Sequence, residues 1–73
     1  MEKESLQMVV AANVKKYREA KGLSQEKLSV AAGLHHSTVG FLERLKHDPS
    51  TSTIQKIADT LGIPEYKLFL RED

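Results

Sequence analysis

The side chains best suited to chemistry in this chain of 73 residues are three histidines and the basic and hydroxyl residues around them. His35 and His36 are sequence neighbours, which cannot share one face of a helix, and no cysteine is present to complete a metal site. The sequence also lacks a nucleophile with an ordered base, a glycine-rich phosphate loop and paired carboxylates at cleft spacing. We therefore predict no metal, no cofactor and no enzymatic activity.

The basic residues are concentrated in the middle of the chain. Residues 13–47 hold seven Lys and Arg against three Glu, together with all three histidines. Residues 1–12 hold one Lys against two Glu, and residues 48–73 hold three basic against five acidic residues. A basic centre between acidic ends favours a face that meets phosphates, although solvated helix faces would give the same pattern.

The length allows one small domain, and a hydrophobic fraction of 40% is typical of an ordinary globular protein. No apolar run approaches the roughly 18 residues that a bilayer span needs. The first ten residues carry acidic side chains where a signal peptide would carry basic ones. We therefore predict a cytoplasmic protein without a membrane segment.

Apolar residues recur at helical spacing throughout, so the predicted fold class is all-α. The predicted helices span residues 6–21, 25–32, about 36–45, the segment between a cap at Ser50 and Gly62, and a short fifth segment after Pro64. The predicted core residues of the last four helices are Leu28, Ala31, Ala32, Val39, Leu42, Ile54, Ile57, Ala58, Leu61, Leu68 and Phe69.

The segment from Gln25 to Glu43 combines a short helix, a turn that contains Gly33 and a second short helix. Two helices joined this tightly are typical of a helix-turn-helix, whose second helix presents its N-terminal residues to base edges. Short helical hairpins are also common in proteins that do not bind DNA, so this geometry alone leaves the function open.

Motifs along nearly the whole chain carry a family resemblance. Residues 14–26 read Val-Lys-Lys-Tyr-Arg-Glu-Ala-Lys-Gly-Leu-Ser-Gln-Glu, and further matches lie at 28, 32–34, 37–39, 42–44, 49–50, 54, 56–58, 61–63 and 68–69. In these motifs the chain resembles the phage-repressor-like (Cro/C1, Xre-type) helix-turn-helix regulators. The resemblance implies a compact five-helix, lambda-repressor-like domain at residues 9–70, with an N-terminal extension at 1–8 and a tail at 71–73.

The resemblance also assigns roles to single residues. It implies that Arg18 and Glu43 form an ion pair that ties the first helix to the end of the recognition helix, the alternative being two unrelated surface charges. The implied base-reading residues are His36, Ser37, Thr38 and Phe41. The implied phosphate-binding residues are Ser24, Gln25, His35, Arg44, Lys46 and His47. For Gln25 the alternative is an exposed polar residue after a helix cap.

Three residues depart from the family pattern or weaken the helix. Phe41 stands where a polar or basic residue is usual, so it either contacts a thymine methyl group or makes a protein contact. Leu45 replaces the usual glycine, which leaves the conformation of the turn after the helix open. Gly40 weakens the helix by up to about 1 kcal/mol relative to Ala, or lets the backbone approach DNA closely.

The resemblance implies a sequence-specific, double-stranded DNA-binding transcriptional regulator that acts as a repressor and binds a palindromic operator as a homodimer. The predicted dimer surface is the fifth helix and C-terminal region, with Tyr66, Phe69 and Leu70, although Leu68 and Phe69 could equally belong to the core. The alternative function is a protein-interaction module, such as an antitoxin-like component, anchored by Phe41, Tyr66 or Leu70.

Overall fold

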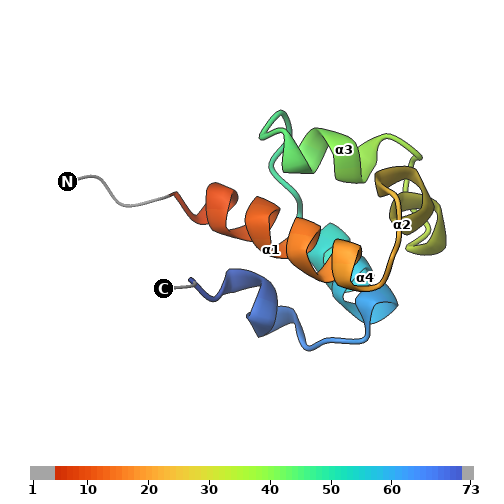
Figure 1. Ribbon diagram of the computed structural model, residues 1–73. Helices are drawn as coiled ribbons and strands as arrows, with labels where there is room; N and C mark the ends of the chain where they lie inside the picture. Colours follow the sequence, from red (N-terminus) through yellow and green to blue (C-terminus); the bar gives the residue numbers. More distant parts are fainter. Residues whose placement is uncertain (1–4, 72–73) are drawn as a thin grey trace.

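The computed structural model describes residues 5–71, which form four α-helices and one 3-10 helix. In chain order these are α1 (Leu6–Ala20), α2 (Gln25–Ala31), α3 (Thr38–Glu43), α4 (Thr51–Leu61) and the 3-10 helix η1 (Glu65–Phe69). Figure 1 shows α3 and the C-terminal segment on opposite sides of α1. The long first helix is therefore the element against which both sides of the molecule are placed.

Serine side chains define where three of the helices begin. Ser5, Ser24 and Ser50 each precede a helix in an extended conformation, and each Oγ accepts a hydrogen bond from the backbone N–H three residues on, at 3.2, 3.0 and 3.1 Å. Such a cap satisfies one of the N–H groups left without a partner in the first turn and typically contributes about 1 kcal/mol. The two caps predicted from the sequence, at Ser24 and Ser50, are both confirmed.

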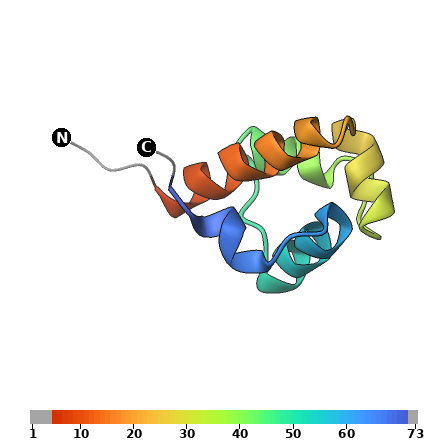
Figure 2. The same ribbon diagram turned by 60° about the horizontal axis from the view of Figure 1, so that its bottom comes forward.

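The core lies between α1 and the other elements, all of which contribute fully buried side chains. These side chains are Val14, Leu28, Val39, Leu42, Ile57 and Leu68. Figure 2 shows α4 and the C-terminal segment together on one side of α1, where Leu68 enters the core. Full burial of one such side chain contributes about 1.5–3 kcal/mol, so this shared core is what holds the short helices in place.

The C-terminal segment is not the fifth α-helix that the sequence predicted. It is a five-residue 3-10 helix that follows Pro64, and the Lys67 N–H donates to the Pro64 carbonyl at 3.1 Å. Leu68 is its only buried residue, and Phe69 retains 36% of its exposure rather than joining the core. One anchoring side chain and five residues suffice for a tight 3-10 turn but not for an extended α-helix.

Two other predicted positions are wrong. The third helix begins at Thr38 rather than near His36, because residues 35–37 form a turn in which His35 Nδ1 accepts from the Ser37 backbone N–H at 3.3 Å. Ala31 is exposed rather than buried, since it lies on the solvent side of α2, whereas Ala32 is buried as predicted.

The predicted N-terminal extension and C-terminal tail are only partly described. Residues 1–4 and 72–73 lie outside the described residues, and Leu6 and the two residues after it already form the first turn of α1. Between residues 5 and 71, no helix is long and apolar enough to cross a membrane.

A buried asparagine joins the end of the chain to α1. Asn13 Nδ2 donates to the carbonyl of Leu68 at 2.9 Å and to that of Leu70 at 2.8 Å. Sequence reasoning missed this residue, although a polar side chain beside Val14 on the apolar side of a predicted helix is a usable signal. The two bonds fix η1 against α1 despite its short length.

Candidate nucleic-acid interface

An ion pair between α1 and the end of α3 holds α3 against α1. Arg18 Nε lies 2.7 Å from Glu43 Oε2, and Nη2 lies 3.0 Å from Oε1, so the predicted pair forms in a two-bonded geometry. The two side chains are only 10% and 5% exposed. The hydrogen bond to Glu43 raises the pKa of Arg18 against the opposing effect of burial, so the guanidinium remains charged across the neutral range.

Gln25 extends this pair into a three-residue network. Its Nε2 donates to Glu43 Oε1 at 2.9 Å, which joins the first residue of α2 to the last residue of α3. Sequence reasoning assigned Gln25 to a phosphate and did not foresee this bond. One of its N–H groups is thereby committed to holding the two helices in register, and the phosphate role stays a prediction.

A buried serine sets the crossing of α2 and α3. Ser29 Oγ donates to the Gln25 carbonyl at 2.9 Å and accepts from the Val39 backbone N–H at 2.9 Å. The second bond satisfies one of the free N–H groups of the first turn of α3, which has no side-chain cap of its own. Sequence reasoning missed Ser29, although its place between Leu28 and Ala32 on the buried side of α2 could have indicated it.

The turn between the two helices depends on one backbone conformation. Gly33 has a φ of 76°, in the left-handed region that side chains with a Cβ rarely adopt. The Leu34 N–H then donates to the Ser29 carbonyl at 2.8 Å, which brings the chain back toward α2 before α3 begins.

The outward side of α3 carries Ser37, Gly40, Phe41 and Arg44, at the spacing of one helical face. Phe41 is 44% exposed, and the Arg44 guanidinium carbon lies 5.4 Å from the centroid of its ring. Gly40 is nevertheless buried, because the side chains of Gln25 and Arg44 cover it. This side of the helix makes no contribution to the apolar core.

Three predicted base-reading residues line one hollow together with two predicted phosphate-binding histidines. The hollow measures about 300 Å³ and is lined by His35, Ser37, Thr38, Phe41 and His47. His36, the remaining base-reading candidate, lies outside it and stacks on His35 with ring centroids 4.4 Å apart. Among residues 5–71, no three His, Cys, Asp or Glu side chains are placed to hold a metal ion.

The turn after α3 adopts a left-handed conformation despite the absence of glycine. Leu45 has a φ of 63°, and the Lys46 N–H closes the turn on the Phe41 carbonyl at 2.9 Å. A left-handed residue with a Cβ costs roughly 1–2 kcal/mol. The turn therefore keeps the shape that a glycine would allow, at a cost in strain, and it leaves Lys46 and His47 exposed.

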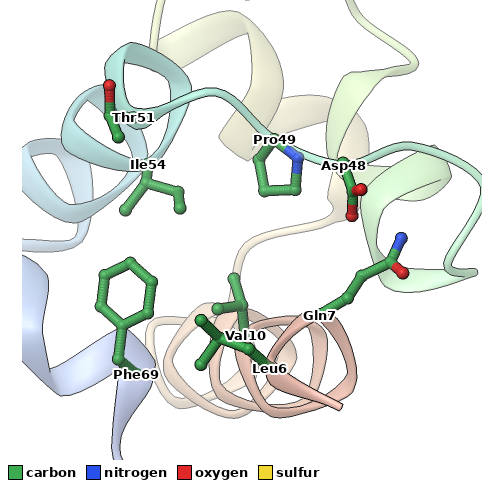
Figure 3. A pocket seen from close by; sticks show the side chains of 8 residues that line it. All are labelled: Leu6, Gln7, Val10, Asp48, Pro49, Thr51, Ile54 and Phe69. Atoms are coloured by element: carbon green, nitrogen blue, oxygen red, sulfur yellow. The ribbon is translucent and has the colours of Figure 1, made fainter.

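An apolar groove lies between the first turns of α1, the start of α4 and η1, and the two residues that follow His47, Asp48 and Pro49, line its edge. Its volume is about 420 Å³, and Leu6, Val10, Ile54 and Phe69 supply its apolar walls. Figure 3 shows these four side chains facing one another across open space, with Gln7 and Asp48 at one side. No residue of α3 lines the groove.

The short α2, the tight turn and an α3 that is fixed on one side and exposed on the other have the arrangement of a helix-turn-helix. A helix-turn-helix family model matches residues 14–68. The chain therefore belongs to the helix-turn-helix family of transcriptional regulators, of the Xre and Cro/C1 type, as the motifs predicted. Membership in this family makes it a sequence-specific DNA-binding regulator and not an enzyme.

Individual relatives show the same relationship. A hypothetical transcription factor of Neisseria meningitidis is 36% identical over 69 residues, which are 94% of this chain and 65% of that protein. The control protein C.SmaI of Serratia marcescens is 36% identical over 64 residues, 88% of this chain and 76% of its own length. The crystal structure of the restriction-modification controller C.AhdI from Aeromonas hydrophila matches with a TM-score of 0.82 and 38% identity, covering 86% of this chain and 96% of that one.

Proposed function

We propose that this chain binds a two-fold symmetric DNA operator as a homodimer, with α3 in the major groove, and represses transcription from that site. The observation that carries the proposal is the contrast between the two sides of α3. Its inner side is held by burial and by the hydrogen bonds of Glu43, whereas its outer side exposes Phe41 and contributes nothing to the apolar core. A helix held this way presents a fixed surface to base edges.

Base reading is assigned to His36, Ser37, Thr38 and Phe41. Ser37 and Thr38 lie at the start of α3, the end that enters the groove first in a helix-turn-helix. Their hydroxyl groups can donate to or accept from base edges, and His36 adds a second donor or acceptor next to them. Phe41 and Thr38 give the hollow beside them apolar walls that suit a thymine methyl group.

Phosphate binding is assigned to residues on either side of the reading surface. The proposed residues are Ser24, Gln25, His35, Arg44, Lys46 and His47. Between residues 5 and 71, neither Arg44 nor Lys46 forms an ion pair, so their charges are available to a polyanion. Arg18 serves the fold instead, because its donors go to Glu43 and to the Leu23 carbonyl.

Dimerisation is assigned to the apolar groove and the exposed side chains of the C-terminal segment. Phe69 lines the groove. Tyr66, in the same 3-10 helix, and Leu70, the next residue along the chain, are exposed. A two-fold interface uses the same patch on both copies, which requires a projecting and a receiving surface within one patch. The groove involves no residue of α3, so pairing through it would leave the reading surface open.

The function is tested by selecting bound sequences from random DNA duplexes and then measuring the affinity for the selected duplexes at increasing salt concentration. We expect enriched sites with two symmetric halves about one helical turn apart, and a steep loss of affinity as salt increases. Recovery of no enriched sequence, with no salt-dependent binding to random duplex, would overturn the proposal. That outcome would favour the alternative of a protein-interaction module or antitoxin-like chain, acting through Phe41, Tyr66 or Leu70.

The dimer surface is tested by sedimentation equilibrium on Phe69→Glu. A buried, unpaired carboxylate is costly, so we expect this variant to sediment as a monomer and to bind DNA more weakly than the unmodified chain. The matched control is Val30→Glu, because Val30 is exposed on α2 and lies away from the groove. Equal self-association of both variants, with helical circular dichroism retained, would place the interface elsewhere.

The regulated genes are a second question on which the relatives bear. Two similar proteins are by name a control protein and a restriction-modification controller. We infer that this chain controls a restriction-modification operon from the bacterial or phage cytoplasm, at the nucleoid where its operator lies. Mapping the selected operator onto the source genome checks this: a site upstream of nuclease and methyltransferase genes supports it, and sites only elsewhere contradict it.

A further inference from the structure

The guanidinium of Arg44 lies back over α3 instead of reaching sideways from its end. Arg44 is the residue immediately after the helix, yet its Nη1 and Nη2 atoms lie 3.5 and 3.6 Å from the point where a Cβ on Gly40 would be. Gly40 is one full turn closer to the start of the helix. Side chains of a helix tilt in this direction, so the guanidinium is carried onto the outward side that also holds Ser37 and Phe41.

The Phe41 ring holds the guanidinium in that position. The central carbon of the guanidinium lies 5.4 Å from the centroid of this ring, within the range of a cation–π contact. Gly40 lies beneath the guanidinium: a Cβ there would be 3.5 and 3.6 Å from Nη1 and Nη2, which is ordinary van der Waals contact, and its one tight contact would be with Gln25 Oε1, at 3.1 Å. Phe41, which departs from the family pattern, therefore acts on Arg44 directly.

Among residues 5–71, no hydrogen bond or ion pair uses the N–H donors of Arg44. The nearest acid in sequence, Glu43, already accepts bonds from Arg18 and Gln25, and Arg44 forms no ion pair within residues 5–71. A guanidinium carries five N–H donors in a rigid plane and matches two parallel acceptors best. In the major groove that pattern is offered by O6 and N7 of guanine.

We propose that Arg44 is a base-reading residue that recognises a guanine, and that Phe41 is the positioning residue that holds it on the reading surface. This rests on the proposed DNA-binding function. For Arg44 alone, it replaces the phosphate role that the sequence resemblance implied and that the proposed function retained; the other proposed phosphate contacts are unaffected. Phe41 then acts first as a platform for Arg44, and only its free edge is left for a neighbouring base.

The test uses the selected operator and a set of duplexes that differ from it at single base pairs. For Arg44→Ala we expect the preference for guanine at one position in each half-site to fall by roughly 5- to 150-fold, while preferences elsewhere remain. The matched control is Lys46→Ala, an exposed cation two residues on, which should weaken all duplexes evenly and reduce the salt slope by about one.

Even weakening of binding to all duplexes in Arg44→Ala would contradict base reading by Arg44. If Arg44→Ala behaves as Lys46→Ala is expected to, with even weakening and a smaller salt slope, Arg44 contacts a phosphate and the proposal is wrong. If the unmodified chain selects no sequence at all, the proposed function itself fails, which is a different outcome.

Phe41→Leu and Phe41→Tyr test the platform. Leucine keeps bulk but removes the ring, so we expect the guanine preference to fall roughly 2- to 5-fold, whereas tyrosine should retain it. Loss of preference at a neighbouring base pair only, with the guanine preference intact in Phe41→Leu, would show that Phe41 reads DNA itself and is not the platform.

Discussion

The two sides of α3 make different contacts, although both belong to one helix of six residues and the residues next to it. On the inner side Val39 and Leu42 are buried, and Glu43 accepts three hydrogen bonds from Arg18 and Gln25. On the outer side Phe41 and Arg44 contact each other but support no core. The contacts that place the helix are thus separate from the surface that the helix exposes.

The contacts on the two sides of α3 also differ in how much they contribute to stability. Removing one partner of a buried ion pair costs about 3–5 kcal/mol, whereas a surface substitution usually changes stability by less than about 0.5 kcal/mol. A domain of this size has only a modest stability to lose. The inner side therefore tolerates little change, and the outer side can be altered without unfolding the protein.

The largest expected effect follows from breaking the inner network at Arg18. Arg18→Ala leaves the Glu43 carboxylate, 5% exposed, without its cation, so we expect the free energy of unfolding to fall by about 3–5 kcal/mol. Urea titration followed by circular dichroism measures it. The control is Glu19→Ala, because Glu19 is 59% exposed and 3.9 Å from Arg18, and its loss should cost less than about 0.5 kcal/mol. Similar losses of stability in the two variants would show that the Arg18–Glu43 pair does not stabilise the fold more than a surface pair does.

A smaller effect on the same side is expected from Ser29→Ala. The substitution leaves the Val39 N–H buried without an acceptor, which costs about 1–3 kcal/mol. The control is Ser52→Ala, an exposed position in α4 where alanine should be neutral or slightly favourable. Thermal unfolding of both variants measures the difference, and an unchanged midpoint for Ser29→Ala would mean that water replaces the hydroxyl group.

The turn after α3 contains a strained residue whose replacement should increase stability. Leu45→Gly removes the left-handed strain of about 1–2 kcal/mol and adds the unfolded-state freedom of glycine, for a net stabilisation of about 0.5–1 kcal/mol. Leu45→Ala keeps the strain and should show no gain. A loss of stability in the glycine variant would indicate that the Leu45 side chain contributes more through the hollow that it lines with Met8 than its backbone costs.

The smallest effect on stability is expected on the outer side. His36 is exposed and stacks only on His35, so His36→Ala should change the free energy of unfolding by less than about 0.5 kcal/mol. The same variant should lower the preference at one base pair of the operator by roughly 2- to 10-fold, the effect of one hydrogen bond. Binding assays with single-base variants of the operator check this. A large loss of stability with unchanged base preference would show that His36 stabilises the fold and does not read DNA.

Much of the local structure could be predicted because its causes are local. Ser24 and Ser50 cap helices through their own backbone neighbours, and the apolar spacing of α4 identified Ile54, Ile57, Ala58 and Leu61 as core, all of which are buried. The start of α3 was misplaced because His35 bonds to Ser37 and delays the helix. The ends of short elements depend on such single contacts, which no periodicity reports.

Of the interface residues, the sequence motifs identified the types but not their partners. They paired Arg18 with Glu43 and placed His36, Ser37, Thr38 and Phe41 at the reading surface. They did not reveal that Gln25 donates to Glu43, that Ser29 accepts from Val39 or that Arg44 lies over Gly40. The contacts of Gln25 and Ser29 join α2 to α3, so their existence depends on how the helices cross. The contact of Arg44, the C-cap of α3, is made with the same helix and depends on the conformation of the side chain, which apolar periodicity does not indicate.

The sequence by itself determined the helical class, most helix boundaries and the family, because capping, apolar periodicity and motif order are properties of neighbouring residues. Only the tertiary structure decided which polar side chains were committed to the fold and which remained available to DNA. Gln25 and Arg44 look alike as polar residues at helix ends, yet one donates inward to a buried carboxylate and the other lies on an exposed aromatic ring. The physical reason is that a hydrogen-bond donor can be assigned to a ligand only after its partners within the protein are known.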